Sequence, residues 1–134
     1  MMMHIEVLHG TEKRLYELVG ALVMDPVVLR QNDNVAFKTT AQHTWFVAVK
    51  KGECIGFLPV KSKGEKGEIN NYYILHRDRE VFTTLVKEAE RYLLKAGYKE
   101  LLIIAQRADY EVVNGLNFDI DKPYVNYTRF SKEL

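Results

Sequence analysis

The chain has 134 residues, 47% of them hydrophobic, and a formal net charge of +1. This composition excludes disordered and collagen-like proteins, and the balanced charge lacks the positive excess of dedicated nucleic-acid-binding proteins. A chain of this length can bury one continuous core and is too short for two ordinary domains. We therefore expect residues 1–134 to form one domain of the α/β (α+β) class, and we do not expect nucleic acid among its partners.

Cysteine usage and the N-terminal residues bear on the cellular setting. Cys54 is the only cysteine in the sequence, so no intrachain disulfide can form, and no Cys/His spacing resembles a zinc site. Residues 1–6 lack the apolar segment of a signal peptide, and no apolar run approaches the length of a membrane span. We expect a cytoplasmic protein with no metal site and no membrane association, in which Cys54 packs in a strand.

The N-terminal third alternates between strand and helix signals. A short strand is expected over His4–Leu8, followed by a helix over 11–24 that Thr11 caps. The dipeptide 25–26 is Asp-Pro, which either ends this helix or starts a second short one, because proline is tolerated at a first helical position. The polar, patternless residues 31–42 indicate a loop.

The central third predicts a meander of three antiparallel strands. Aromatic and β-branched residues over Thr44–Val49 and Cys54–Val60 predict two strands joined by a turn at 51–53. The basic, glycine-rich residues 61–67 indicate a longer turn, after which Glu68–Leu75 is expected to form the third strand.

A long amphipathic helix is expected after the meander. Apolar residues recur at helical spacing from Val81 to Leu93, and Gly97 suits the left-handed position after the last turn. Residues 101–105 are wholly apolar, as in a strand covered on both faces. A short helix is expected at 108–116. Two strands are expected at 118–120 and 124–130, joined by a turn at 121–123.

Two segments and the order of the elements carry a resemblance. Thr44–Phe57 combines an apolar strand, a glycine turn and a strand containing Ile-Gly, and Lys95–Tyr98 joins a helix end to an apolar strand. Both resemble the GNAT (GCN5-related N-acetyltransferase) superfamily. The resemblance implies a central mixed, mostly antiparallel sheet of about six to seven strands flanked by helices. It also implies transfer of an acetyl group from acetyl-CoA to the amine of a small molecule or a macromolecule.

The coenzyme A motif of that superfamily, R/Q-x-x-G-x-G/A, falls where the third strand meets the long helix. Arg77 matches its first position, whereas Glu80 and Phe82 replace its two small residues. Glycine matters there because it adopts positive φ and lets a phosphate approach the backbone. Glu80 also places negative charge where the pyrophosphate would lie, and repulsion there costs on the order of 1 kcal/mol.

Two interpretations of this turn stay open. By resemblance, the pyrophosphate binds at the helix start formed by Arg77, Asp78, Arg79 and Val81, with the two arginines pairing with its phosphates. Alternatively, the turn is a solvated helix start, in which Asp78 is the N-cap and Glu80 favours the positive end of the helix dipole.

The resemblance also assigns the reactive end of the site. The splayed backbone of the central strand, here Tyr72, Tyr73 and Ile74, would pair with the pantetheine amides and polarise the thioester carbonyl. Glu68 lies at the start of that strand. It is the candidate general base, which takes the proton of the acceptor amine.

Other proton-transfer residues are less well marked. The usual general acid of the superfamily, a tyrosine that reprotonates the thiolate, is replaced by Val113, and Tyr110 one helical turn earlier is the candidate substitute. His43 and His76 are further titratable candidates, because only histidine is poised near neutral pH without help from its surroundings.

Three hypotheses follow. The first is an acyl-CoA-dependent N-acyltransferase, which the element order and Arg77 support and which Glu80 and Val113 oppose. The second is a GNAT-like binding or regulatory domain without catalysis, which the lost glycines favour. The third is a transferase that uses another donor or modifies nucleic acid, which the basic residues 61–66 suggest. The sequence leaves open the acceptor and whether the chain forms a homodimer.

Overall fold

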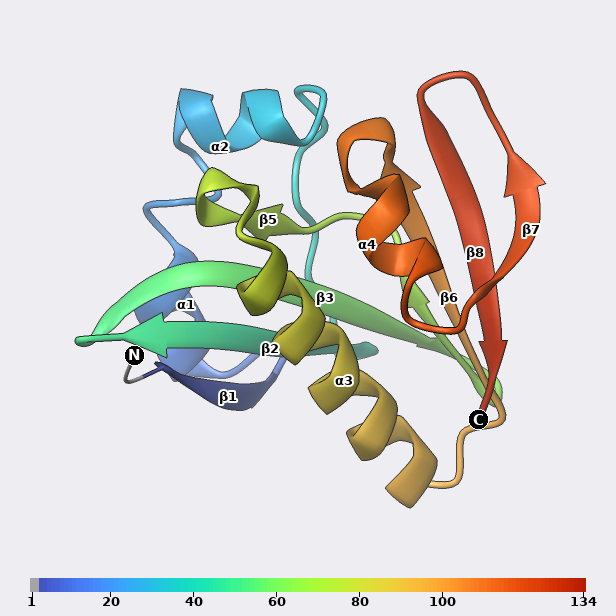
Figure 1. Cartoon of the computed structure of the whole chain (residues 1–134). Coiled ribbons are helices and arrows are strands. Elements are labelled where there is room, and N and C mark those ends of the chain that lie inside the picture. The colour runs from blue at the N-terminus through green and yellow to red at the C-terminus, as the bar shows by residue number, and fades with distance from the viewer. Residues whose placement is uncertain (1–2) are drawn as a thin grey trace.

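The computed structural model of the chain describes residues 3–134, which contain one eight-stranded sheet (Figure 1). Its strands are β1 (Met3–His9), β2 (His43–Lys50), β3 (Glu53–Lys63), β4 (Lys66–Ile69), β5 (Tyr73–Ile74), β6 (Glu100–Gln106), β7 (Asp119–Pro123) and β8 (Tyr127–Glu133). The strand order is β1-β2-β3-β4-β6-β8-β7, with β5 paired to β3 outside this path. β4 and β6 are parallel and the other pairs are antiparallel, which confirms the expected mixed, mostly antiparallel sheet.

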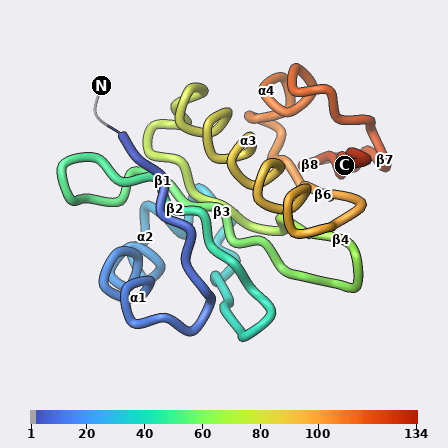
Figure 2. Tube along the Cα trace, turned by 90° about the horizontal axis from the view of Figure 1, so that it is seen from below, coloured from blue at the N-terminus to red at the C-terminus, as the bar shows by residue number. Residues whose placement is uncertain are grey.

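Helices cover both faces of this sheet. α3 (Arg79–Lys95) and α4 (Tyr110–Asn114) lie on one face, and α1 (Lys13–Val19) and α2 (Pro26–Gln31) lie on the other (Figure 1, Figure 2). Single 3-10 turns precede α3 and α4, at Leu75–Arg77 and Arg107–Asp109. Within residues 3–134, no helix is both long enough and apolar enough to cross a membrane.

Alternation along β2 builds a core on each face. Phe46 and Ala48 belong to the core under α3, whereas Trp45, Val47 and Val49 belong to the core under α1, because successive strand residues face opposite ways. The buried residues of α3 are Val81, Phe82, Leu85, Val86, Ala89 and Leu93. The helical spacing predicted for this segment is therefore confirmed.

The sheet splits after Ile69. β4 pairs with β3 on one side and with β6 on the other, whereas β5 pairs with β3 alone. Within residues 3–134, β6 has no strand opposite it on the β5 side beyond Ile103, although its pairing with β8 continues to Gln106. Figure 1 shows β5 and β6 diverging. The split leaves a row of backbone polar groups on each of these strands without a strand partner.

Both predicted ends of the long helix are confirmed. Asp78 caps α3, because its Oδ1 accepts hydrogen bonds from the backbone N–H of Glu80 at 2.9 Å and of Val81 at 3.1 Å. Gly97 has a φ of 90°, the left-handed conformation that glycine adopts without strain.

The predicted third strand, 68–75, is wrong at both ends. β4 already begins at Lys66, Asn70 to Tyr72 leave the ladder, and Leu75 starts the 3-10 turn. The long turn predicted at 61–67 is also wrong, because β3 continues to Lys63 and the true turn is the pair 64–65. Charged residues at exposed strand positions had suggested a turn. Gly67 is needed for packing instead: a Cβ there would lie 2.8 Å from Leu93 Cδ1.

The turn predicted at 121–123 lies inside β7, and the true connection is 124–126. Pro123 is tolerated because β7 is an edge strand, where a missing N–H leaves no partner unbonded. In β6, the coverage on both faces predicted for 101–105 is only partial, because Leu102 and Ile104 are half-buried while their neighbours in the strand are buried.

Thr11 is not the helix cap that the sequence suggested. α1 begins at Lys13 with Glu12 as the preceding residue, and the Thr11 hydroxyl instead bonds to His9 Nδ1 at 2.9 Å. α1 ends at Val19 rather than at 24.

A second helix starts at the Asp-Pro dipeptide, which settles the alternative left open above. Pro26 is the first residue of α2, and Asp25 Oδ1 accepts the Val27 N–H at 2.8 Å. The predicted loop 31–42 is wrong at its first residue, because Gln31 is the last residue of α2.

The cap of α3 gives a first test. Replacing Asp78 by alanine leaves two first-turn N–H groups without their acceptor, so Asp78→Ala should lower the free energy of unfolding by about 1 kcal/mol. Chemical denaturation measures it, with Asp119→Ala in the exposed strand β7 as the matched control. Equal losses in the two variants would contradict the capping role.

Candidate functional site

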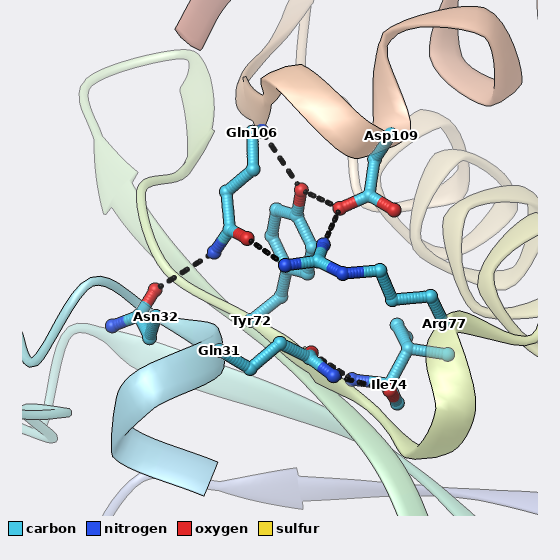
Figure 3. Close-up of polar contacts among 7 residues, drawn as sticks. All are labelled: Gln31, Asn32, Tyr72, Ile74, Arg77, Gln106 and Asp109. Carbon is cyan, nitrogen blue, oxygen red and sulfur yellow. Dashed lines mark hydrogen bonds and ion pairs between the residues drawn. The ribbon is translucent and has the colours of Figure 1, made fainter. Parts of the chain in front are cut away.

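A buried carboxylate connects the two sides of the split. Asp109, in the 3-10 turn after β6, is 3% exposed. Its Oδ2 accepts hydrogen bonds from the Tyr72 hydroxyl at 2.6 Å and from Arg77 Nη1 at 2.7 Å. Figure 3 shows both donors reaching it from the β5 side. These partners are required, because a buried charge without them is strongly destabilising.

Tyr72 also satisfies the free edge of β6. Its hydroxyl accepts the backbone N–H of Gln106 at 2.9 Å. Burial, followed by the neighbouring Asp109 carboxylate, raises the pKa of Tyr72 well above its ordinary value. The phenol therefore stays protonated and keeps its bond to Asp109.

Arg77 reaches across the split to the end of β6. Besides Asp109, its guanidinium donates from Nη2 to the side-chain Oε1 of Gln106 at 2.8 Å (Figure 3). The backbone there is unusual, with φ of 56° at His76 and 49° at Arg77, a conformation that non-glycine residues rarely adopt. The sequence predicted that Arg77 pairs with a pyrophosphate. In this structure its partners lie within the chain, and the phosphate role stays a prediction.

An amide from α2 occupies the free edge of β5. The side chain of Gln31 donates from Nε2 to the carbonyl oxygen of Ile74 at 2.8 Å, and its Oε1 accepts the Ile74 N–H at 3.0 Å. Figure 3 shows the two side by side. Ile74 lies opposite Gly56 of β3, and Tyr73 lies opposite Phe57, so Gln31 bonds to β5 where β3 does not.

Asn32 fastens the end of α2 to both sides of the split. It is 5% exposed, and its Nδ2 donates to Asn71 Oδ1 at 3.0 Å, just before β5. Its Oδ1 accepts from Gln106 Nε2 at 3.4 Å, on β6. The last turn of α2 is therefore tied to β5 by Gln31 and to β6 through Asn32.

The start of α3 matches the capped-helix interpretation. The N–H groups of Glu80 and Val81, which a pyrophosphate would use, are bonded to the Asp78 carboxylate. Val81 itself is buried, and Arg79 is mostly exposed, with its guanidinium 3.6 Å from Glu111. Of the predicted phosphate-binding residues, Asp78 and Arg79 are exposed, and Arg79 is the one of these two that carries a positive charge.

Glu68 lines a separate cavity, beside the split. This cavity has a volume of about 180 Å³ and is also lined by His43, Asn70 and Asn71. Burial, followed by the nearby Lys61 ammonium, lowers the pKa of His43, so its imidazole is neutral at pH 7. Because Asn71 also bonds to Asn32, the cavity adjoins the polar network of the split.

The structure does not bring Tyr110 to this cavity. Tyr110 lines another one, of about 650 Å³, with Arg107, Glu111 and Tyr124 among its neighbours. Its ring packs against Phe130, with the ring centroids 5.4 Å apart. The role of Tyr110 as general acid stays a prediction, because Tyr110 and Glu68 line different cavities.

Tyr73 and Cys54, which were also considered in the sequence, are both packed against neighbouring residues. Tyr73 packs in the core under α1, with its ring 5.7 Å from that of Phe57, and burial raises its pKa. Burial raises the pKa of the Cys54 thiol to about 11, so the thiolate that a nucleophile needs is scarce at pH 7.

Sequence reasoning missed Gln31, Asn32, Gln106 and Asp109. Gln106 ends an apolar strand, and Asp109 lies just before a short helix. The signal available for both was a polar residue close to an apolar run. Gln31 and Asn32 gave no signal, because each lay in a stretch without periodicity and bonds to residues far away in the sequence.

The chain is similar to known proteins in structure rather than in sequence. No protein-family model and no curated protein sequence matches it. The PaiA N-acetyltransferase of Thermoplasma acidophilum in complex with coenzyme A is 17% identical, with a TM-score of 0.69 and 100% of both chains covered. A GNAT family acetyltransferase of Elizabethkingia anophelis with acetyl-CoA bound is 15% identical, with a TM-score of 0.66 and 98% of each chain covered.

A third counterpart is Tetrahymena GCN5, which is 15% identical with a TM-score of 0.74, covering 97% of this chain and 95% of that one. Similarities at this level of identity establish the fold. The chain has the GNAT fold, and the resemblance predicted from its sequence is confirmed at that level.

The hydroxyl of Tyr72 offers a test of the network. Tyr72→Phe removes a donor to Asp109 and an acceptor for the Gln106 N–H, and should lower the free energy of unfolding by about 1–3 kcal/mol. Tyr92→Phe, with an exposed ring on α3, is the control and should change little. A Tyr72→Phe protein as stable as the control would show that the network adds nothing to stability.

The same hydroxyl predicts a pH dependence. An unfolded tyrosine ionises near pH 10, whereas folded Tyr72 holds its proton to higher pH, so the unfolded state loses the proton first. Stability from this group is complete below about pH 10 and falls as the pH rises further. Denaturation at increasing pH should therefore show a steeper loss in the wild type than in Tyr72→Phe. Parallel losses would contradict the assignment.

Proposed function

We propose that the chain is an acyl-CoA-dependent N-acyltransferase, which moves an acetyl group from acetyl-CoA to an amine. The observation that supports this proposal is the free edge of β5, where the N–H and C=O of Ile74 hold an amide. Pantetheine is an extended chain that carries amides, and such an edge can pair with it as with an added strand. Similarity to acetyltransferases solved with coenzyme A or acetyl-CoA supports the same function.

The residues present fit one end of this co-substrate better than the other. On β5, the N–H and C=O of Ile74 already bind an amide, which supports a role for them in pairing with the pantetheine end. At the pyrophosphate end, Glu80 and Phe82 replace the small residues and the Asp78 carboxylate already bonds the first-turn N–H groups. We therefore assign donor recognition mainly to the backbone of the split.

Bound acetyl-CoA would supply an acyl group activated as a thioester. The acceptor amine would enter the cavity beside the split, where Glu68 takes its proton and so leaves a neutral nucleophile. His43 is a second proton acceptor in the same cavity, because its lowered pKa leaves the imidazole neutral at pH 7.

A binding or regulatory domain without catalysis is the second candidate. One observation favours it: the backbone and side-chain groups of the split already have partners within the chain, from Gln31 on β5 to Tyr72 on β6. A fold that had lost its co-substrate would need such partners, because buried polar groups without them are costly.

Donor binding and acetyl transfer separate the two candidates, and Glu68 tests the mechanism of the first. Calorimetric titration should give saturable binding of acetyl-CoA and of coenzyme A, and thiol release from acetyl-CoA should rise with one or more amines from a panel. Glu68→Gln should slow that release about 10²- to 10⁴-fold, because the general base is lost, and leave donor affinity unchanged.

The matched control is Glu65→Gln, in the exposed turn between β3 and β4. If Glu68→Gln transfers acetyl groups as fast as this control, Glu68 is not the base. If neither the wild type nor a protein with Gln31 replaced binds the donor at millimolar concentration, the binding domain is the better description.

A further inference from the structure

We propose that Gln31 is an internal competitor of the acyl donor: its amide closes the β5 edge, and the donor binds only after Gln31 has moved away. This inference rests on the proposed function, because it concerns the regulation of the same site. The structure is then the closed state of the protein, and α2 carries the element that opens.

The competition follows from the geometry of the two amides. A primary amide presents its oxygen and one N–H on the same side, so the side chain of Gln31 engages both polar groups of Ile74 at once, at 2.8 Å and 3.0 Å. A pantetheine amide needs at least one of these groups. Each backbone group has one good partner at a time in this geometry, so Gln31 and the donor exclude one another.

The edge of β5 to which Gln31 bonds is also the edge that a donor would use. β5 pairs with β3 on one edge, and the edge that Gln31 uses is the one that a further strand would extend. An extended donor placed between β5 and β6 would therefore meet the Gln31 side chain directly. The guanidinium of Arg77, bonded to Gln106 and Asp109, crosses the same opening (Figure 3).

α2 is held lightly enough to move. It has six residues, of which Val28 is the buried one, while Val27 and the preceding Met24 are 63% and 75% exposed. Its C-terminal end is held by Gln31 and by the bonds of Asn32 to Asn71 and Gln106. These are polar contacts that a donor can replace, whereas the rest of the helix adds little buried surface to keep it closed.

The consequence is a reduced apparent affinity. If the donor binds only the fraction of molecules in which Gln31 has left, the apparent dissociation constant exceeds the intrinsic one by the inverse of that fraction. Removing the amide should therefore tighten binding. Two hydrogen bonds of ordinary strength predict an effect of about 30-fold.

The test compares Gln31→Leu with the wild type and with Gln42→Leu, a control in the exposed loop before β2. Calorimetry with coenzyme A should give about 30-fold tighter binding for Gln31→Leu and no change for Gln42→Leu. Amide hydrogen exchange gives a readout independent of activity. Without ligand, the Ile74 N–H should exchange faster in Gln31→Leu than in the wild type, and coenzyme A should slow it in both.

Gln31→Glu keeps the size of the side chain and offers a second route if Gln31→Leu does not fold. A neutral carboxylic acid has one donor and one acceptor, like the amide, whereas a carboxylate can only accept and repels the Ile74 carbonyl. Gln31→Glu should bind coenzyme A like the wild type near pH 4 and more tightly than the wild type at pH 7, since a glutamate ionises near pH 4.3.

The outcomes distinguish the inference from the function beneath it. Equal affinity of wild type and Gln31→Leu, with coenzyme A protecting Ile74 in both, would overturn the competition and leave the proposed function standing. Protection of Ile74 that persists in unliganded Gln31→Leu would also overturn the competition. Failure of every variant to bind coenzyme A would overturn both.

Discussion

The buried carboxylate of Asp109 constrains the whole junction between β5, α3 and β6. It lies almost without solvent, so its charge must be met by donors from the protein, and these are the Tyr72 hydroxyl and the Arg77 guanidinium. Tyr72 can reach it because the central strand breaks before β5. Arg77 reaches it from a turn in which two successive residues have positive φ. That backbone strain persists because the ion pair and the capped helix after it hold the turn in place.

The split in the sheet creates a second requirement: the backbone groups on the inner edges of β5 and β6 need hydrogen-bond partners. Where β4 ends, neither β5 nor β6 has a strand from the described part of the chain on its inner edge. A buried N–H or C=O left alone there would cost more than most contacts contribute. Gln31 bonds the β5 edge and Tyr72 bonds the β6 edge. Among residues 3–134, no buried side-chain nitrogen or oxygen lacks a partner. The side chains of the split are therefore bonded within the chain, and an amide-bearing ligand could bind Ile74 only in exchange for Gln31.

Local patterns predicted the fold well and the network poorly. The alternation of β2, the helical spacing of α3 and the Asp78 cap depend on neighbours in sequence, and each was predictable from the residues alone. The break before β5 was not predicted, and Asn71, which leaves the ladder there, bonds to Asn32, 39 positions away in the chain. Gln31 and Ile74 are 43 positions apart in the chain, and a lone glutamine in a patternless stretch says nothing about such a partner. Glu68 was predicted because its place in the strand follows from the resemblance, and its role as a base stays a prediction.

In the proposed function, the donor replaces Gln31 as the hydrogen-bond partner of Ile74. Such an exchange would allow a donor site in a chain that lacks the glycines of the pyrophosphate turn. At the start of α3, the Asp78 carboxylate already accepts the N–H groups of Glu80 and Val81, so these groups are bonded without an added anion. The edge of β5 is likewise stable when Gln31 covers it. The free energy available to a donor is then the difference between its bonds to Ile74 and those of Gln31, rather than their full value. For the transferase proposed above, these contacts predict weak, competitive donor binding at the pantetheine end and an activity that depends on the position of α2.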